Sequence, residues 1–329
     1  MNYKTVDEMI NKAYSLEDEG KNKEALEIWN TGFNDFLEED VKEYEFDIYI
    51  GRIWGNFLLK NSEGFINNII EAVEKGFICP YWMFEYKKNK EYETFLKLWQ
   101  NDLRYEKTRK KNDALKVEKE KRTKFEYKVY LPELYDENKK YPLFIAMHGD
   151  GDNMKLLETE WKSESFLDRG YIVVYVQSSQ VYNNDGYSWI NNFDITRRDI
   201  KTFYQEIRER YFINEECVIL GGFSGGAIAG IDILMEDVIS IKSLIAICPE
   251  RKPESVTIEN IDKAMHRKVK VVFMEGEKSL PMKYEEEMLE MFKEVGLPCE
   301  YYINKDLGHE IPKDFDEKID KILEFIYND

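Results

Sequence analysis

The segment that most constrains the fold of this chain runs from Cys217 to Gly230 and reads CVILGGFSGGAIAG. Its first four residues suit a buried strand, and its last residues are small and suit the start of a helix. Between them, residues 222–226 match the G-x-S-x-G pattern, which places a serine on a sharp turn with its hydroxyl clear of the sheet edge. The pattern predicts a nucleophile elbow at Ser224, flanked by glycines because side chains there would collide with the neighbouring strand and helix.

Beyond Phe125 the chain alternates short apolar runs with amphipathic stretches. Continuous apolar runs are typical of parallel strands that are buried on both faces of a sheet. The alternation predicts an α/β fold with a doubly wound, mostly parallel sheet, whose ligands bind at the carboxyl ends of the strands. We expect strands at residues 125–131, 143–147, 171–176, 217–220, 244–247, 269–274 and 299–303, and helices at residues 156–168, 195–211, 227–235, 283–295 and 315–327.

The N-terminal third reads as helices, expected at residues 6–16, 25–37, 47–60, 64–75 and 91–103. The pattern Ala13, Gly20, Ala25 and Trp29 resembles one tetratricopeptide-like helical hairpin, although the chain has no clean period of about 34 residues. We expect a smaller all-α domain at residues 1–120 and an α/β domain at residues 121–329. The helices either bind a protein partner, cap the substrate site, or only pack on the larger domain.

A basic run ends the helical part, since residues 104–124 contain ten Lys/Arg and four Asp/Glu. Such runs can dock a partner but are more often solvated helices or linkers, and we expect a linker here. The chain of 329 residues as a whole has a net charge of −18. This acidic balance opposes a general affinity for nucleic acids or anionic membranes.

The four cysteines lie far apart, without the spacing of a metal knuckle or a redox pair. We therefore expect no metal site and a reduced, cytoplasmic protein. The first ten residues lack the apolar core of a signal peptide, and no apolar run approaches the length of a membrane span. We expect no membrane span.

A serine nucleophile needs a base, usually histidine, and this chain contains three histidines. His148 ends a buried strand, and His266 precedes a strand and so lies at the wrong end of the sheet. His309 follows the last strand and reaches the carboxyl edge near Ser224. Elimination predicts His309 as the base.

An acyl-transfer oxyanion needs two backbone N–H donors that are placed in advance. The first is expected from Gly225, the residue after the nucleophile. The second is expected from the glycine-bearing loop at residues 148–151, most simply from the Asp150 N–H. An aspartate is tolerable there if its side chain turns outward.

Residues from about 125 to the C-terminus resemble an α/β-hydrolase of the carboxylesterase/acyl-protein-thioesterase branch. The resemblance covers roughly two thirds of the chain and implies a serine esterase that needs no cofactor. Its substrates would be small carboxylic esters or thioesters, cleaved through an acyl-enzyme. The matching motifs are the His148-Gly149 loop, Gln177-Ser178-Ser179-Gln180 followed by Tyr187-Ser188-Trp189, the Gly222–Gly226 turn, and Gly308-His309.

The chain departs from this family at the acid of the triad. The family usually places an aspartate where this sequence has Ser279, and a serine cannot stabilise imidazolium by charge. Glu277 or Glu275 from the same loop, or Glu250 from the end of the preceding strand, could replace it. Asp306 is close in sequence to His309 and is a weaker choice.

The missing aspartate also suggests a second hypothesis, in which the protein is not an effective enzyme. The chain would then be a catalytically weak or inactive hydrolase-fold protein whose N-terminal helices recruit a partner. A peptidase of the same fold is a third reading, which needs a pocket that the sequence does not reveal.

Overall fold

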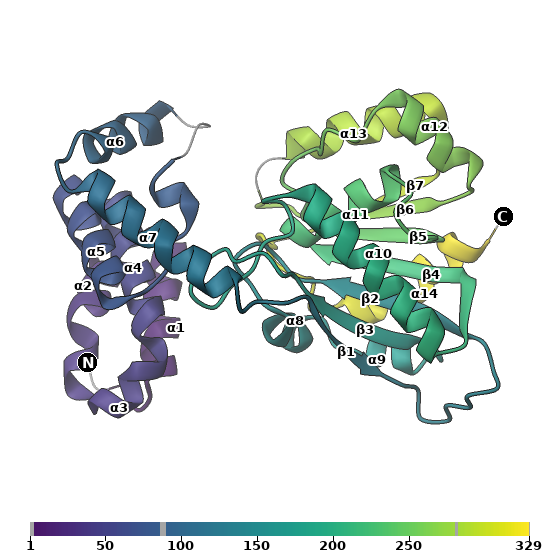
Figure 1. The fold of residues 1–329 in the computed structure, drawn as a ribbon, viewed down its shortest axis with the longest axis horizontal. Coiled ribbons are helices and arrows are strands. Elements are labelled where there is room, and N and C mark those ends of the chain that lie inside the picture. The colour runs from purple at the N-terminus through teal and green to yellow at the C-terminus, as the bar shows by residue number, and fades with distance from the viewer. Residues whose placement is uncertain (1–2, 86–89, 280–281, 329) are drawn as a thin grey trace. The chain divides into compact units, whose positions relative to one another are not determined.

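The strands expected beyond residue 125 form one sheet in the computed structural model, which describes residues 3–85, 90–279 and 282–328 (Figure 1). Among these residues the sheet has seven strands in the order β1-β3-β2-β4-β5-β6-β7. β1 runs antiparallel to β3 and the other pairs are parallel, as expected from the alternating pattern. The strands are β1 (Glu126–Tyr130), β2 (Tyr141–Met147), β3 (Ile172–Gln177), β4 (Ile213–Phe223), β5 (Ser243–Ile247), β6 (Lys270–Gly276) and β7 (Cys299–Asn304).

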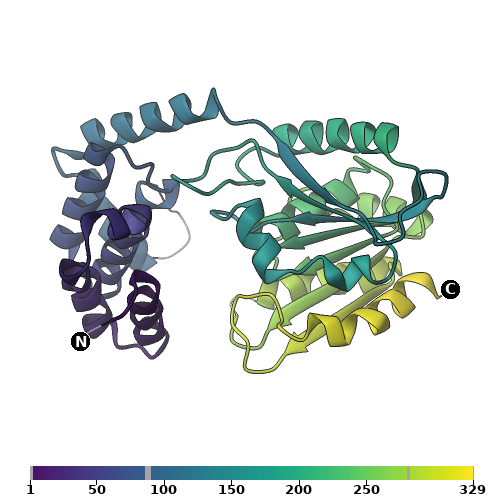
Figure 2. The same ribbon diagram turned by 90° about the horizontal axis from the view of Figure 1, so that it is seen from below.

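Helices cover both faces of the sheet, because the central strands are apolar on both sides (Figure 2). Alternate residues of β2 show the division: Leu143 and Ile145 belong to one core and Phe144 to the other. The first core packs against α10 (Phe193–Arg210), α11 (Gly225–Met235), α12 (Ile258–His266) and α13 (Met282–Val295). The second packs against α8 (Met154–Glu160), α9 (Glu164–Leu167) and α14 (Phe315–Tyr327).

The structure differs from the sequence expectations at three places in this part of the chain. The single helix expected at residues 156–168 is split into α8 and α9, because Trp161 adopts an extended backbone with φ −118° and ψ 91°. Its indole is buried and packs edge-on against Phe144 and Phe315. Helix α12, which ends at His266, was not predicted, and β4 begins four residues earlier than expected.

The chain consists of two compact units, residues 1–122 with 182–184, and residues 123–181 with 185–329. The first unit contains α1 (Val6–Asp18), α2 (Asn22–Thr31), α3 (Glu38–Val41), α4 (Glu45–Leu58), α5 (Ser62–Lys75), α6 (Lys90–Gln100) and α7 (Tyr105–Glu120), with short 3-10 turns between some of them. Its described residues contain no strand. Independent folding of this unit as an all-α domain, and its likeness to a tetratricopeptide hairpin, stay predictions.

Most of the basic run expected as a linker is the helix α7, and several of its lysines pair with nearby carboxylates. The Lys111 ammonium lies 2.7 Å from a carboxylate oxygen of Glu74 on α5. Within the described ranges, no helix has the length and apolar character to cross a membrane.

Candidate active site

Ser224 occupies the tight turn between β4 and α11, as the G-x-S-x-G pattern predicts. Its backbone has φ 50° and ψ −115°, a region that an L-residue adopts only under strain of about 1–3 kcal/mol. The Ser224 N–H donates to the Ile247 carbonyl at 2.8 Å, and its carbonyl accepts from the Ile228 N–H at 3.0 Å. These two bonds hold the serine between the end of β5 and the first turn of α11.

The glycines around Ser224 are required by close backbone contacts. A Cβ atom on Gly222 would overlap the carbonyl group of Gly226 in the following helix. A Cβ atom on Gly226 would lie 2.5 Å from the carbonyl oxygens of Met147 and His148 at the end of β2. The predicted collisions with the helix and the neighbouring strand are therefore confirmed.

The two expected oxyanion donors are both uncommitted. Among the described residues, no acceptor takes the N–H of Gly225, which begins α11, or the N–H of Asp150. By contrast, the next two N–H groups, of Gly151 and Asp152, donate to backbone carbonyls. The helix N-terminus also favours negative charge at this point.

The Asp150 side chain turns inward, contrary to the outward direction expected for it. Its Oδ1 atom accepts the Trp189 N–H at 3.2 Å and occupies the space where a Cβ atom on Gly225 would be. Burial raises the pKa of this carboxyl group to about 6, although hydrogen bonds from Ser188 and Trp189 and the charge of Arg251 favour its ionised form. The reason for the inward turn is the Trp189 N–H, which needs an acceptor.

His309 lies in the loop after β7, which rests on the end of β6. A Cβ atom on Gly276 would overlap the Gly308 carbonyl oxygen, and the Lys278 N–H donates to the Leu307 carbonyl at 2.8 Å. The ring centroids of His309 and Phe223, the residue before the nucleophile, are 5.1 Å apart. The loop thus brings the imidazole to the edge of the sheet that carries Ser224.

The Nδ1 atom of His309 faces two candidates for the acid position. The Ser279 Oγ atom lies 3.5 Å away, and the Glu250 Oε1 atom lies 3.7 Å away. Glu277 instead accepts the Asp306 N–H at 3.0 Å.

Glu275 is also directed elsewhere, because its buried carboxylate accepts the N–H of the following residue, Gly276, at 3.2 Å. Of the three glutamates considered from the sequence, the structure therefore brings Glu250 to His309.

The other two histidines are placed away from this chemistry. His148 is fully buried, its Nδ1–H donates to the Gly149 carbonyl at 2.7 Å, and its Nε2 accepts the Ser178 N–H at 3.3 Å. Burial lowers the pKa of this imidazole to about 4, so it stays neutral and structural. His266 ends α12 and pairs with Asp262 at 3.5 Å.

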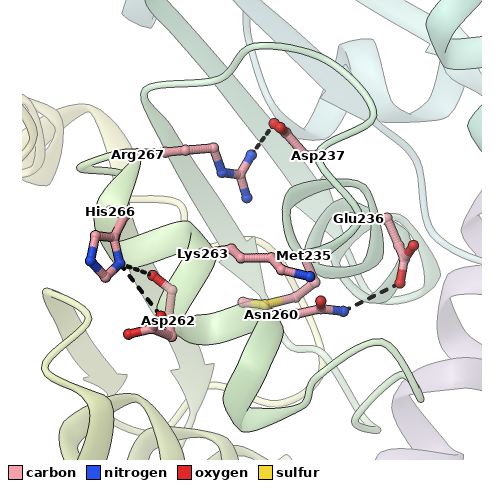
Figure 3. Close-up of a pocket in the computed structure, with 8 residues that line it drawn as sticks. All are labelled: Met235, Glu236, Asp237, Asn260, Asp262, Lys263, His266 and Arg267. Carbon is pink, nitrogen blue, oxygen red and sulfur yellow. Dashed lines mark hydrogen bonds and ion pairs between the residues drawn. The ribbon is translucent and has the colours of Figure 1, made fainter.

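His266 lines an open surface pocket of about 700 Å³ near the amino end of β6. Figure 3 shows the side chains that line this pocket. The charged groups in it are largely paired with one another, as Arg267 is with Asp237. This pocket lies at the opposite end of the strands from Ser224. Its lining residues are Met235, Glu236, Asp237, Asn260, Asp262, Lys263, His266 and Arg267.

Sequence reasoning missed two acidic side chains, Asp152, whose carboxyl group interacts with the charge of His309, and Glu160, which interacts with Asp152. Burial raises the pKa of Asp152, and the charge of His309 acts in the opposite direction. Glu160 also has a raised pKa, through burial and the charges of Asp152 and Glu310. Asp152 directly follows the loop at residues 148–151, which was the available signal, but only the backbone of that loop was given a role.

A cavity of about 390 Å³ lies beside the His309 loop, between α8, α9 and the start of α14. Trp161 forms part of its wall, and the buried Nε1–H of this indole has no hydrogen-bond acceptor in the described part of the chain. The same described part contains no cluster of three His, Cys, Asp or Glu side chains able to hold a metal ion.

No family model matches the chain, and no curated protein matches its sequence significantly. Among solved structures, it is similar to an uncharacterized protein from Bacillus cereus ATCC 10987, with 22% identity, a TM-score of 0.52, and coverage of 98% of this chain and 99% of that chain. Esterase PE8 is 18% identical with a TM-score of 0.50, over 62% of this chain and 99% of its own. A ferulic acid esterase is 15% identical with a TM-score of 0.51, over 61% of this chain and 91% of its own.

These similarities show the fold. The mostly parallel sheet and its covering helices form an α/β-hydrolase fold of the kind found in esterases.

Proposed function

We propose that this protein is a serine hydrolase that cleaves small carboxylic esters or thioesters through an acyl-enzyme. The observation that carries the proposal is the strained backbone of Ser224, held at a strand–helix turn with free N–H groups beside it. Strain of this kind is maintained where function requires it. Two of the similar structures are esterases, which supports ester hydrolysis as the reaction.

In the first half-reaction, His309 Nε2 accepts the proton of Ser224 Oγ as that oxygen bonds to the substrate carbonyl carbon. The carbonyl oxygen becomes an oxyanion, which the N–H groups of Asp150 and Gly225 hold. When the tetrahedral intermediate collapses, the bond to the alcohol or thiol breaks and the imidazolium returns its proton to the leaving group.

In the second half-reaction, water replaces the alcohol. His309 takes a proton from the water as the water oxygen attacks the acyl carbon, and the second tetrahedral intermediate expels Ser224 Oγ. The imidazolium protonates that oxygen, so the enzyme returns to its starting state and the acid product leaves.

Glu250 acts as the acid in this proposal. Its charge stabilises the imidazolium, while the Ser279 hydroxyl oxygen accepts a hydrogen bond from the same Nδ1–H. A carboxylate near an imidazole stabilises the imidazolium. The imidazolium is the form that the base takes in both transition states.

The cavity beside the His309 loop suits a small substrate group. Its volume of about 390 Å³ falls within the range of ordinary small-molecule sites. No step of the mechanism needs a cofactor.

The alternative of an inactive binding protein rests on Ser279 in the acid position. The carboxylate of Glu250 near Nδ1 weakens that argument, because it supplies the charge that serine lacks. Recruitment of a partner by the helical unit stays a prediction, since it can accompany either function.

Labelling with a fluorophosphonate probe tests the proposal, because the probe reacts only with a serine whose base and oxyanion donors are assembled. We expect the wild type to be labelled and Ser224→Ala and His309→Ala to be unlabelled, with matching loss of p-nitrophenyl acetate hydrolysis. A folded wild type that neither labels nor hydrolyses esters would refute the proposal and favour the binding protein.

A further inference from the structure

Asp150 brings a carboxyl group to a place where the proposed oxyanion hole needs only a backbone N–H. The Oδ1 atom is fixed by the Trp189 N–H at 3.2 Å, and the Ser188 hydroxyl also donates to the carboxyl. The carboxyl occupies the space of a Cβ atom on Gly225, whose N–H is the other proposed donor. Asp150 therefore contributes a backbone N–H that can bind the oxyanion. It also places an ionisable carboxyl group beside Gly225, the other donor.

The charge of this group affects the transition state directly. An ionised carboxylate and an oxyanion repel each other, and the repulsion is strong where water is excluded. A neutral carboxyl group of the same shape does not repel, and its O–H can donate. The ionised Asp150 side chain thus weakens the binding of the oxyanion by the two N–H groups, and the neutral side chain strengthens it.

Several groups around Asp150 determine which form is present. The hydrogen bonds from Ser188 and Trp189, the charge of Arg251 and the N-terminus of α11 favour the ionised form. Burial and the nearby charge of Asp152 favour the neutral form. Burial outweighs the groups that favour the ionised form and raises the pKa to about 6, so the group changes its charge within the range of ordinary buffers.

We propose that the Asp150 carboxyl group is a charge switch on the oxyanion hole, permitting acyl transfer when neutral and slowing it when ionised. The inference rests on the proposed esterase function. It assigns a role to the side chain of a residue whose backbone alone entered the mechanism.

The test compares kcat/KM for p-nitrophenyl acetate in the wild type and in Asp150→Asn between pH 4.5 and pH 8.5. The amide keeps the shape and the acceptor for the Trp189 N–H but carries no charge. Dividing the two profiles cancels ionisations that both proteins share. We expect a ratio near one at low pH that rises through about pH 6 to at least about tenfold in favour of the variant.

Two further variants make the result specific. Asp168→Asn, an exposed aspartate at the end of α9, is the matched control and should give a flat ratio near one. Ser188→Ala removes a donor to the ionised carboxyl and should move the wild-type transition to higher pH. This second readout decides the question if Asp150→Asn fails to fold.

The outcomes separate this inference from the function on which it rests. If the wild type is labelled at Ser224 and hydrolyses the ester, but the ratio is flat and Ser188→Ala moves nothing, the switch is wrong and the esterase stands. If the folded wild type shows neither labelling nor hydrolysis, both are wrong.

Discussion

The Oε1 atom of Glu250 lies 3.7 Å from the Nδ1 atom of His309, although the two residues follow different strands, β5 and β7. Ser279, which follows the strand between them, brings its Oγ atom to 3.5 Å from the same nitrogen. Three neighbouring parallel strands therefore end in side chains that meet at one imidazole. The negative charge comes from one strand end and the nearer hydrogen-bonding group from another.

Glu250→Gln should lower kcat for ester hydrolysis by about 10- to 100-fold with little change in KM. This is less than the loss of about 10⁴-fold seen for a fully buried triad aspartate, because the Glu250 side chain is 52% exposed and its charge is screened. Glu277→Gln should change kcat by less than about threefold, since Glu277 is bonded to the Asp306 N–H. Steady-state kinetics check both, and the reverse ranking would make Glu277 the acid.

Ser279→Asp should restore activity to the Glu250→Gln variant. The new carboxylate would stand where the serine now faces His309 Nδ1, and a charge there stabilises the imidazolium. We expect a gain of about tenfold or more in kcat over the single variant. Ser279→Asn in the same background has nearly the same size without the charge, and an equal gain from it would show that charge is not the cause.

Gly226→Ala should abolish fluorophosphonate labelling, because its Cβ atom would press on the backbone carbonyls at the end of β2. Overpacking of this kind lowers the free energy of unfolding by about 1–3 kcal/mol. Gly230→Ala on the same helix is the matched control, since its Cβ atom would press on the end of the Leu244 side chain at 2.8 Å, rather than on backbone, and would make ordinary contact with Leu220. Fluorophosphonate labelling and urea unfolding are measured for both variants. Full labelling of Gly226→Ala would show that the close backbone contact at Gly226 is not needed for a reactive serine.

Asp150 should also affect stability as a function of pH. Its pKa is raised to about 6 in the folded protein from 3.8, so the folded state binds the proton more tightly than the unfolded state. Stability from this group therefore falls as pH rises between about 4 and 6. Relative to Asp150→Asn, the wild type should lose about 2 kcal/mol of unfolding free energy from pH 4 to pH 7.

Urea unfolding of both proteins at the two pH values gives this difference directly. A difference that stays constant with pH would show that Asp150 titrates near its ordinary value, which would also weaken the proposed switch.

The local features of the site that depend on neighbouring residues could be predicted from the sequence. The turn at Ser224 follows from glycines within two positions of it, and the strands follow from continuous apolar runs. His309 followed from a choice among three histidines and their positions relative to strands. Each of these predictions depends either on residues that are close in sequence or on the common direction of the strands in the sheet.

The features that sequence could not predict depend on distant partners. The inward turn of Asp150 depends on the N–H of Trp189, and the break at Trp161 depends on packing with Phe144 and Phe315. The acid was ambiguous because Glu250 and Glu277 follow neighbouring strands that end at the same edge. Only the path of the backbone beyond each strand distinguishes them.

The order of the strands also has a consequence for how activity arises during folding. Ser224, Glu250 and His309 follow β4, β5 and β7, so no partly assembled sheet that lacks the last strand holds all three. Helices can form earlier, because they need only contacts close in sequence, whereas parallel strands pair with strands that are distant in sequence. Catalytic activity would therefore be the last property to return on refolding. A chain truncated between β6 and β7 would be inactive even if most of its sheet still formed.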